Sequence, residues 1–206
     1  SGRRPRDRFA GGGGHGPVVV GAHGRGVGGA VFVLFMNADG TVSSEQEIGA
    51  ATGGFGIGID AIDRFGAAAT GVGDLDGDGV EDLVVGSWFD DDGADDAWAI
   101  WVLFLNTDGT VKAKQKISAA EGGLSSPIVD GVFASVAAIG DIDGDRRPDL
   151  AVGAYGGDGA ASSGAVHIVF LDTAPFTTCA DSPTAIPQSE CDALVDLYNS
   201  TGGATD

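Results

Sequence analysis

Asp74-Leu75-Asp76-Gly77-Asp78-Gly79-Val80-Glu81-Asp82 is the most informative stretch of this sequence. Carboxylates occupy its first, third, fifth and ninth positions, and a glycine that permits a sharp turn occupies the fourth. Alternating oxygen ligands around such a turn are typical of a site for one hard cation, with Ca²⁺ the natural candidate. Because carboxylates held this close repel one another, an ordered loop needs a counter-charge. The spacing therefore favours a calcium loop over a solvated acidic turn.

The same pattern returns as Asp141-Ile142-Asp143-Gly144-Asp145-Arg146-Arg147-Pro148-Asp149. An EF-hand would have a glutamate at the twelfth loop position, where Val85 and Val152 stand here. Aliphatic runs follow both loops, so each loop is expected to lead into a strand, with Gly86 or Gly153 ending it. We predict two structural calcium sites, the second weaker because Arg146 replaces a loop glycine. The predicted metal-binding residues are Asp74, Asp76, Asp78, Val80 and Asp82 in the first site, and Asp141, Asp143, Asp145, Arg147 and Asp149 in the second.

Composition indicates an all-β protein of acidic character. Among 206 residues, 43% are hydrophobic, which is enough for a core, and 37 glycines without a triplet repeat indicate many tight turns. A net charge of −19 disfavours nucleic acid or an anionic membrane surface as a partner. The longest apolar run, residues 97–105, is too short to cross a bilayer as a helix, so no direct membrane insertion is expected.

Three repeating units follow one another along the chain. The glycines Gly21, Gly86 and Gly153 lie at matching places, and aromatic-rich strands are expected at 29–36, 97–105 and 164–171. Asp-Gly turns at 37–42 and 106–111 predict hairpins, with return strands near 44–48 and 112–117. Lysines 112, 114 and 116 alternate along the second return strand, a pattern expected to protect a sheet edge by charge.

These units resemble the FG-GAP repeat of integrin α-chain propellers. The resemblance rests on Phe65-Gly66, the small-residue strand after it, the acidic loop, Leu83-Val84-Val85-Gly86 and the hairpin strand. A second copy runs from Phe133 to Leu171, whereas the first unit lacks the acidic loop and is expected to bind no calcium. The resemblance implies four-stranded propeller blades, with the metal loops on one rim and partner recognition on the opposite face.

The predicted organisation is a basic, glycine-rich arm over 1–16, about two and a half blades over 17–171, and a separate tail over 172–206. Cys179 and Cys191 are the only cysteines, and a disulfide between them is favoured over two free thiols. A short helix from Ser189 and a glycosylation acceptor at Asn199 are also expected in the tail, which resembles the amino-terminal cap of leucine-rich repeats.

A partial β-propeller with a short C-terminal helix is thus the predicted fold. Propellers close with four to eight blades, so the chain is a fragment of a longer protein, completes a ring with other copies, or stacks head to tail. The first functional hypothesis is an extracellular, secreted or cell-surface adhesion or recognition module that binds a protein or glycan ligand. The alternative is a structural subunit of an extracellular filament or surface sheath, built from copies of itself through blade edges. Three scattered histidines and no nucleophile elbow disfavour a third possibility, a secreted hydrolase.

Overall fold

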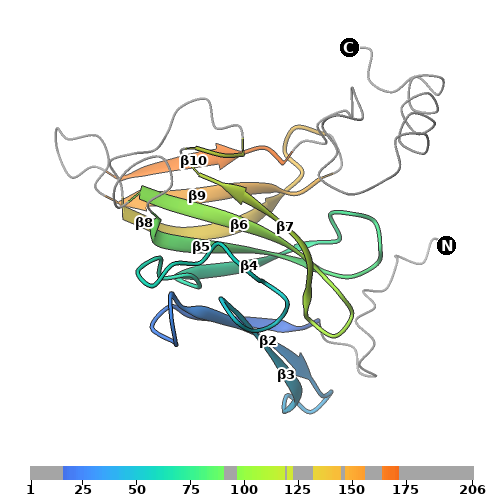
Figure 1. The fold of residues 1–206 in the computed structure, drawn as a ribbon. Coiled ribbons are helices and arrows are strands. Elements are labelled where there is room, and N and C mark those ends of the chain that lie inside the picture. Colours follow the sequence, from blue (N-terminus) through green and yellow to red (C-terminus); the bar gives the residue numbers. More distant parts are fainter. Residues whose placement is uncertain are drawn as a thin grey trace, which may run out of the picture. The chain divides into compact units, whose positions relative to one another are not determined.

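The computed structural model describes residues 16–90, 97–118, 120–122, 132–144, 147–155 and 164–171. These residues form ten β-strands and no helix, all within one compact unit, Ser1–Phe170. The strands make three antiparallel sheets that lie side by side in Figure 1. The all-β prediction is confirmed for this part of the chain. The predicted helix, disulfide and glycosylation acceptor of the tail, including Cys179, Cys191 and Asn199, lie outside it.

The middle sheet has four strands in sequence order: β4 (Ala68–Gly73), β5 (Asp82–Asp90), β6 (Ala97–Leu105) and β7 (Val111–Ile117). Each strand pairs antiparallel with the next, as a meander whose connections all join sequence neighbours. This four-stranded sheet is consistent with one complete propeller blade.

Three-stranded sheets flank the middle one. The first sheet contains β1 (Val18–Ala22), β2 (Ala30–Met36) and β3 (Val42–Gly49), and the third contains β8 (Val132–Gly140), β9 (Asp149–Tyr155) and β10 (Ala165–Val169). β4 contacts both β1 and β8, so the three sheets are packed in chain order. The arrangement is consistent with partial propeller blades.

The two predicted hairpins are confirmed, and they share one hydrogen-bonding scheme. In the first, the Asn37 amide donates to the Thr41 carbonyl at 2.8 Å, and in the second the Asn106 amide donates to the Thr110 carbonyl at the same distance. Gly40 and Gly109 have φ of 85° and 82°, the left-handed conformation that glycine adopts without strain. The Asp-Gly pairs therefore place each return strand as the sequence predicts.

The prediction that a glycine ends each loop-proximal strand is wrong. β5 continues through Gly86 to Asp90, and β9 continues through Gly153 to Tyr155. Close approach of another backbone explains the glycine at the equivalent position of the first sheet, since a Cβ on Gly21 would lie 2.2 Å from the Gly66 carbonyl oxygen. At Gly21 the missing side chain therefore allows close packing of the two backbones.

Phe65 and Gly66 join the first sheet to the second. The Phe65 ring is fully buried, and its amide donates to the Gly28 carbonyl at 2.7 Å. Gly66 has φ of 85°, and a Cβ there would lie 2.2 Å from the Ala30 carbonyl oxygen. Thus the phenylalanine fills the core between the sheets, while the glycine lets the backbone of one unit touch the other.

The main hydrophobic core lies between the first and middle sheets. Phe55 stands at its centre, with ring centroids 5.1 Å from Phe65 and 5.0 Å from Trp101, both edge to face. Such aromatic pairs add to the stability that burial of their area provides. The other core members are Val31, Val33, Ile48, Ile59, Val80, Leu83, Val85, Leu103, Leu105 and Val111.

Candidate metal loops and the cleft at the opposite end

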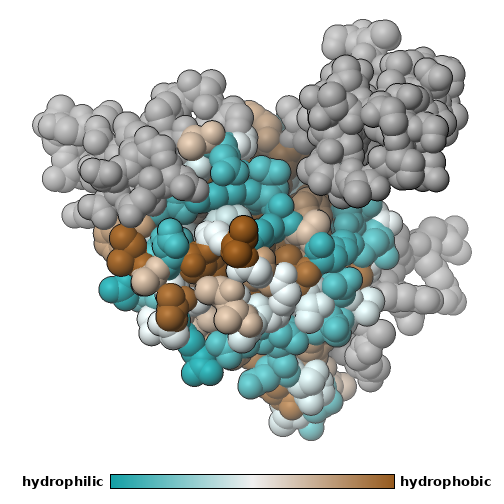
Figure 2. Space-filling view, in the orientation of Figure 1, coloured by the Kyte–Doolittle hydropathy of each residue, from teal (hydrophilic) through white to brown (hydrophobic). Residues whose placement is uncertain are grey.

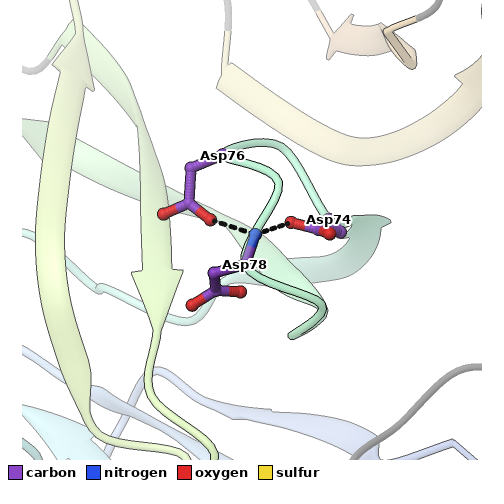
Figure 3. A group of neighbouring side chains, drawn as sticks. All are labelled: Asp74, Asp76 and Asp78. Atoms are coloured by element: carbon purple, nitrogen blue, oxygen red, sulfur yellow. Dashed lines mark hydrogen bonds between the residues drawn. The ribbon is translucent and has the colours of Figure 1, made fainter.

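The loop between β4 and β5 is organised around the carboxylate of Asp74 (Figure 3). One oxygen of Asp74 accepts hydrogen bonds from the amides of Gly77 at 2.7 Å and Asp78 at 3.0 Å. The other accepts from the amide of Gly79 at 2.8 Å. Gly77 and Gly79, with φ of 82° and 86°, allow the chain to wrap around this side chain. The wrapping brings Asp74, Asp76 and Asp78 together.

Buried residues fix both ends of this loop. The Leu75 and Val80 side chains are only 7% and 4% exposed, and they anchor the loop to the sheet. Asp82 is fully buried, and its two carboxylate oxygens accept the amides of Leu75 at 2.9 Å and Leu105 at 3.0 Å. The ninth residue therefore ties the loop to both β5 and the end of β6.

Burial raises the pKa of Asp82 to about 6, against the two backbone hydrogen bonds that lower it. Nearby Asp76 adds to the rise through charge repulsion. Keeping this carboxylate ionised at neutral pH therefore costs free energy. A cation in the loop would lower that cost.

The carboxylates of the loop suit a hard cation. Asp74, Asp76 and Asp78 each offer an oxygen, and these oxygens all lie within 4.8 Å of one another. Two oxygens on the same calcium ion are at most about 5 Å apart, because Ca–O distances are about 2.5 Å. The set contains only oxygen, the donor that Ca²⁺ prefers. Predicted ligand Asp82 is not in this group, and Val80 contributes a buried side chain.

The second loop joins β8 to β9 and repeats part of this geometry. Oxygens of Asp141, Asp143 and Asp149 lie within 4.8 Å of one another. Asp149 is buried and accepts the Ile142 amide at 2.8 Å, as Asp82 accepts that of Leu75. Predicted ligand Asp145 lies outside the described residues, and Arg147 is half-buried. The ninth residue joins the carboxylate group here, unlike in the first loop.

Lys112 on β7 reaches the first loop, a contact that the local spacing of the loop does not predict. Its ammonium lies 2.7 Å from Asp76 and also donates to Asp78. The hydrogen bond from Lys112 lowers the pKa of Asp78. Desolvation opposes ionisation of the lysine, but its bonds to both carboxylates raise the pKa of Lys112 overall. A protein cation thus neutralises part of the loop.

β7 is the edge strand of its sheet, as predicted, and its three lysines also make contacts within the unit. Lys114 donates to the Phe55 carbonyl at 2.8 Å and lies over the Phe55 ring, 3.8 Å from its centroid. Lys116 is buried and its ammonium lies 2.7 Å from the carboxylate of Asp90. All three side chains are engaged inside the unit because their face of β7 turns toward the loops and the core.

A cleft of about 450 Å³ opens at the other end of the first two sheets. Its walls come from the β1–β2 connection, the β3–β4 connection and the end of β5, whereas the metal loop lies between β4 and β5. Arg64 and Phe89 line it with φ of 53° and 55°, conformations that cost strain and gather at functional sites. The exposed Ile62 lies beside them, and apolar residues form small groups on the face that Figure 2 shows.

The basic side chains of the cleft are His23 and Arg64, while Asp63 lies next to Arg64 in the chain. His23 is held by stacking on Trp88, with ring centroids 5.5 Å apart. Asp63 is buried, which raises its pKa, and accepts the amide of Asp60 at 2.8 Å. The hydrogen bond from the Asp60 amide to buried Asp63 therefore stabilises the segment that carries Arg64.

Comparison with known proteins agrees with the repeat assignment. Residues 133–169 match the FG-GAP repeat. The chain is 32% identical over 134 residues to "Integrin alpha pat-2" of Caenorhabditis briggsae, which covers 65% of this chain and 10% of that protein. It is 33% identical over 96 residues to "Integrin alpha-PS2" of Drosophila melanogaster, covering 46% and 7%. The chain thus spans about a tenth or less of the length of these relatives.

The likeness to integrin α-chains and the FG-GAP match support the resemblance predicted for the repeating units. They give no support to the leucine-rich-repeat cap proposed for the tail, which stays a prediction. In the part of the chain that the structure describes, no helix is long and apolar enough to cross a membrane.

Proposed function

We propose that this chain is a calcium-stabilised adhesion or recognition module of the extracellular space or cell surface. The observation that carries the proposal is the recurrence of one acidic loop at equivalent places of two sheets, with three carboxylates converging in each. The similarity to integrin α-chains supports the location and a non-enzymatic role. Calcium has a structural part in this proposal.

The ion of the first site would be held by Asp74, Asp76 and Asp78. Asp82 would keep the loop in place by accepting the Leu75 amide. Asp141, Asp143 and Asp149 would hold that of the second, with Asp145 and Arg147 as the remaining predicted contributors. A bound ion supplies positive charge that offsets the repulsion among these carboxylates. The two loops then fix the connections between the first and second strands of their sheets.

The cleft opposite the metal loops is the proposed place for a protein or glycan ligand. The strained residues Arg64 and Phe89 and the stacked His23 give it shape, and Arg64 gives it a positive charge in a chain of net charge −19. Ordered loops on a rigid scaffold are the usual location of binding residues. In this proposal the metal loops stabilise that scaffold at the opposite end of the same strands.

Asp76→Ala tests the calcium part of the proposal, with Asp108→Ala as a matched control. Asp108 also sits in a tight turn, where its carboxylate accepts the Thr110 amide at 3.0 Å, but it lies outside the metal loops. With calcium at about a hundred times Kd, binding adds about 2.7 kcal/mol to the free energy of unfolding. We expect Asp76→Ala to lose much of this increment and to change little in chelator.

The readout is thermal and urea unfolding of both variants with calcium and with excess chelator. Asp108→Ala should lose the same stability under both conditions, because its turn needs no metal. Equal losses for Asp76→Ala with and without calcium would show that the loop has no structural metal.

A further inference from the structure

Each sheet has two apolar faces, and the packing of the first sheet on the second defines how such faces meet. The face of the first sheet that turns toward the second carries Val31, Val33 and Phe35. The facing residues of the second sheet are Leu83 and Val85 on β5 and Trp101 and Leu103 on β6. We call the first kind of surface the forward face and the second kind the backward face.

The forward face is buried in the first two sheets and exposed in the third. Val31 and Val33 are fully buried, and their equivalents in the second sheet, Ile100 and Val102, are 0% and 5% exposed. In the third sheet the residues equivalent to Val31 and Val33 are Val166 and Ile168, which are 69% and 43% exposed.

The backward face shows the reverse. In the second and third sheets its β5 and β9 residues are buried: Leu83, Val85, Leu150 and Val152. In the first sheet the equivalents Val18 and Val20 are 45% and 43% exposed. The strand register is also preserved, since Val18 pairs with Leu34 and Val20 with Phe32 just as Leu83 pairs with Leu103 and Val85 with Trp101.

We propose that the forward face of the third sheet docks on the backward face of the first sheet of a second copy of this chain. Each copy exposes one face of each kind, and these are the two kinds that pair inside the molecule. The contact is therefore heterologous, head to tail, and repeats the internal packing of sheet on sheet. The contact uses flat faces of the sheets rather than the strand edges expected from the sequence, and it requires neither calcium nor the cleft.

Two variants each remove one face: Val166→Glu/Ile168→Glu and Val18→Glu/Val20→Glu. All four side chains are exposed, so charge there should leave each copy folded. Ile57→Glu is the control, because Ile57 is 92% exposed and belongs to neither face. Circular dichroism and thermal unfolding check the fold of every variant.

Light scattering over a range of concentrations then gives the mass of each protein. We expect the native chain and Ile57→Glu to form species larger than a dimer, and each double variant alone to be a monomer. An equimolar mixture of the two double variants should give one species of twice the monomer mass, because one free face of each kind remains.

Three results would overturn the proposal. A native chain that stays monomeric at all concentrations would mean that other blades, outside this sequence, cover these faces. Assembly by either folded double variant alone would place the contact elsewhere. A native dimer that the mixture fails to restore would indicate a symmetric contact of one face with itself.

Discussion

Lys112 shows how one residue far along the chain enters the metal loop. It lies 34 positions after Asp78, and the register of β7 on β6, together with that of β6 on β5, brings its ammonium to Asp76 and Asp78. A lysine there supplies part of the counter-charge that the acidic loop requires. It also competes for the same oxygens as a metal ion would.

Replacing Lys112 with methionine should therefore act in two directions. We expect Lys112→Met to lower the calcium Kd roughly threefold to tenfold, because removing one nearby cation favours another by about 1 kcal/mol at this partly exposed site. In chelator the same variant should be less stable than the native chain, since the carboxylates lose their counter-charge. Calorimetric titration and unfolding in chelator measure the two effects.

Lys114→Met is the matched control, because Lys114 lies two residues along the same face and contacts the Phe55 carbonyl instead of the loop. Its calcium affinity should equal that of the native chain. An unchanged calcium Kd in Lys112→Met would mean that the lysine ammonium does not compete with calcium for the loop oxygens.

The spacing of the acidic loop predicted which carboxylates come together, but not what each of them does. Asp74, Asp76 and Asp78 converge because alternate positions around a glycine turn point inward. Asp82 instead accepts amides from Leu75 and from Leu105, a partner on a different strand. Such roles depend on strand pairing over long distances, which the local spacing does not contain.

At the scale of the elements, one ion pair recurs with its charges exchanged. In the first sheet Arg25 lies four residues after Gly21 and binds Glu47 at 3.0 Å. In the second sheet Asp90 lies four residues after Gly86 and binds Lys116 at 2.7 Å. Arg25 lies between β1 and β2 and binds the edge strand β3, whereas Asp90 ends β5 and binds the edge strand β7; each cation also lies near an aromatic ring.

The buried pair should matter far more than the exposed one. Lys116 and Asp90 side chains are 7% and 2% exposed, against 57% and 29% for Arg25 and Glu47. We expect Lys116→Met to lower the free energy of unfolding by about 3–5 kcal/mol, because it removes one partner of a buried ion pair. Urea unfolding of Lys116→Met beside Arg25→Met makes the comparison, and Arg25→Met should change little.

A second substitution separates charge from packing. Asp90→Ala in the Lys116→Met background removes the second member of the buried pair and should restore part of the stability. If the double variant is as unstable as Lys116→Met, the loss comes from packing around the lysine stem, and the charge pair is not its cause.

Most elements could be predicted from local patterns, and the exceptions have a common cause. The Asp-Gly turns and the run 97–105 match the observed hairpins and β6, because turn chemistry and aliphatic runs act within a few residues. The supposed strand ends at Gly86 and Gly153 were wrong because neighbouring strands, rather than the local chain, determine where those strands stop. The partners of the β7 lysines likewise depend on contacts with residues distant in sequence.

At the scale of the whole molecule, the net charge of −19 means that both salt screening and specific calcium binding should stabilise the fold, and an experiment must separate the two effects. Any added salt screens repulsion among surface carboxylates and stabilises the folded chain to some degree. Specific binding adds a further increment that follows the free calcium concentration. We therefore expect calcium chloride to raise the melting temperature more than sodium chloride at equal ionic strength.

The part of the rise in melting temperature that calcium chloride gives beyond sodium chloride should come from calcium binding at the two loops. Asp76→Ala/Asp143→Ala removes one carboxylate from each carboxylate group while leaving most of the net charge in place. This variant should keep the sodium response and lose the additional calcium response, because screening depends on total charge and binding depends on convergent oxygens. Differential scanning calorimetry of both proteins in both salts makes the distinction. If the excess survives in the double variant, calcium acts on the acidic surface as a whole, and the loops are turns that need no bound ion.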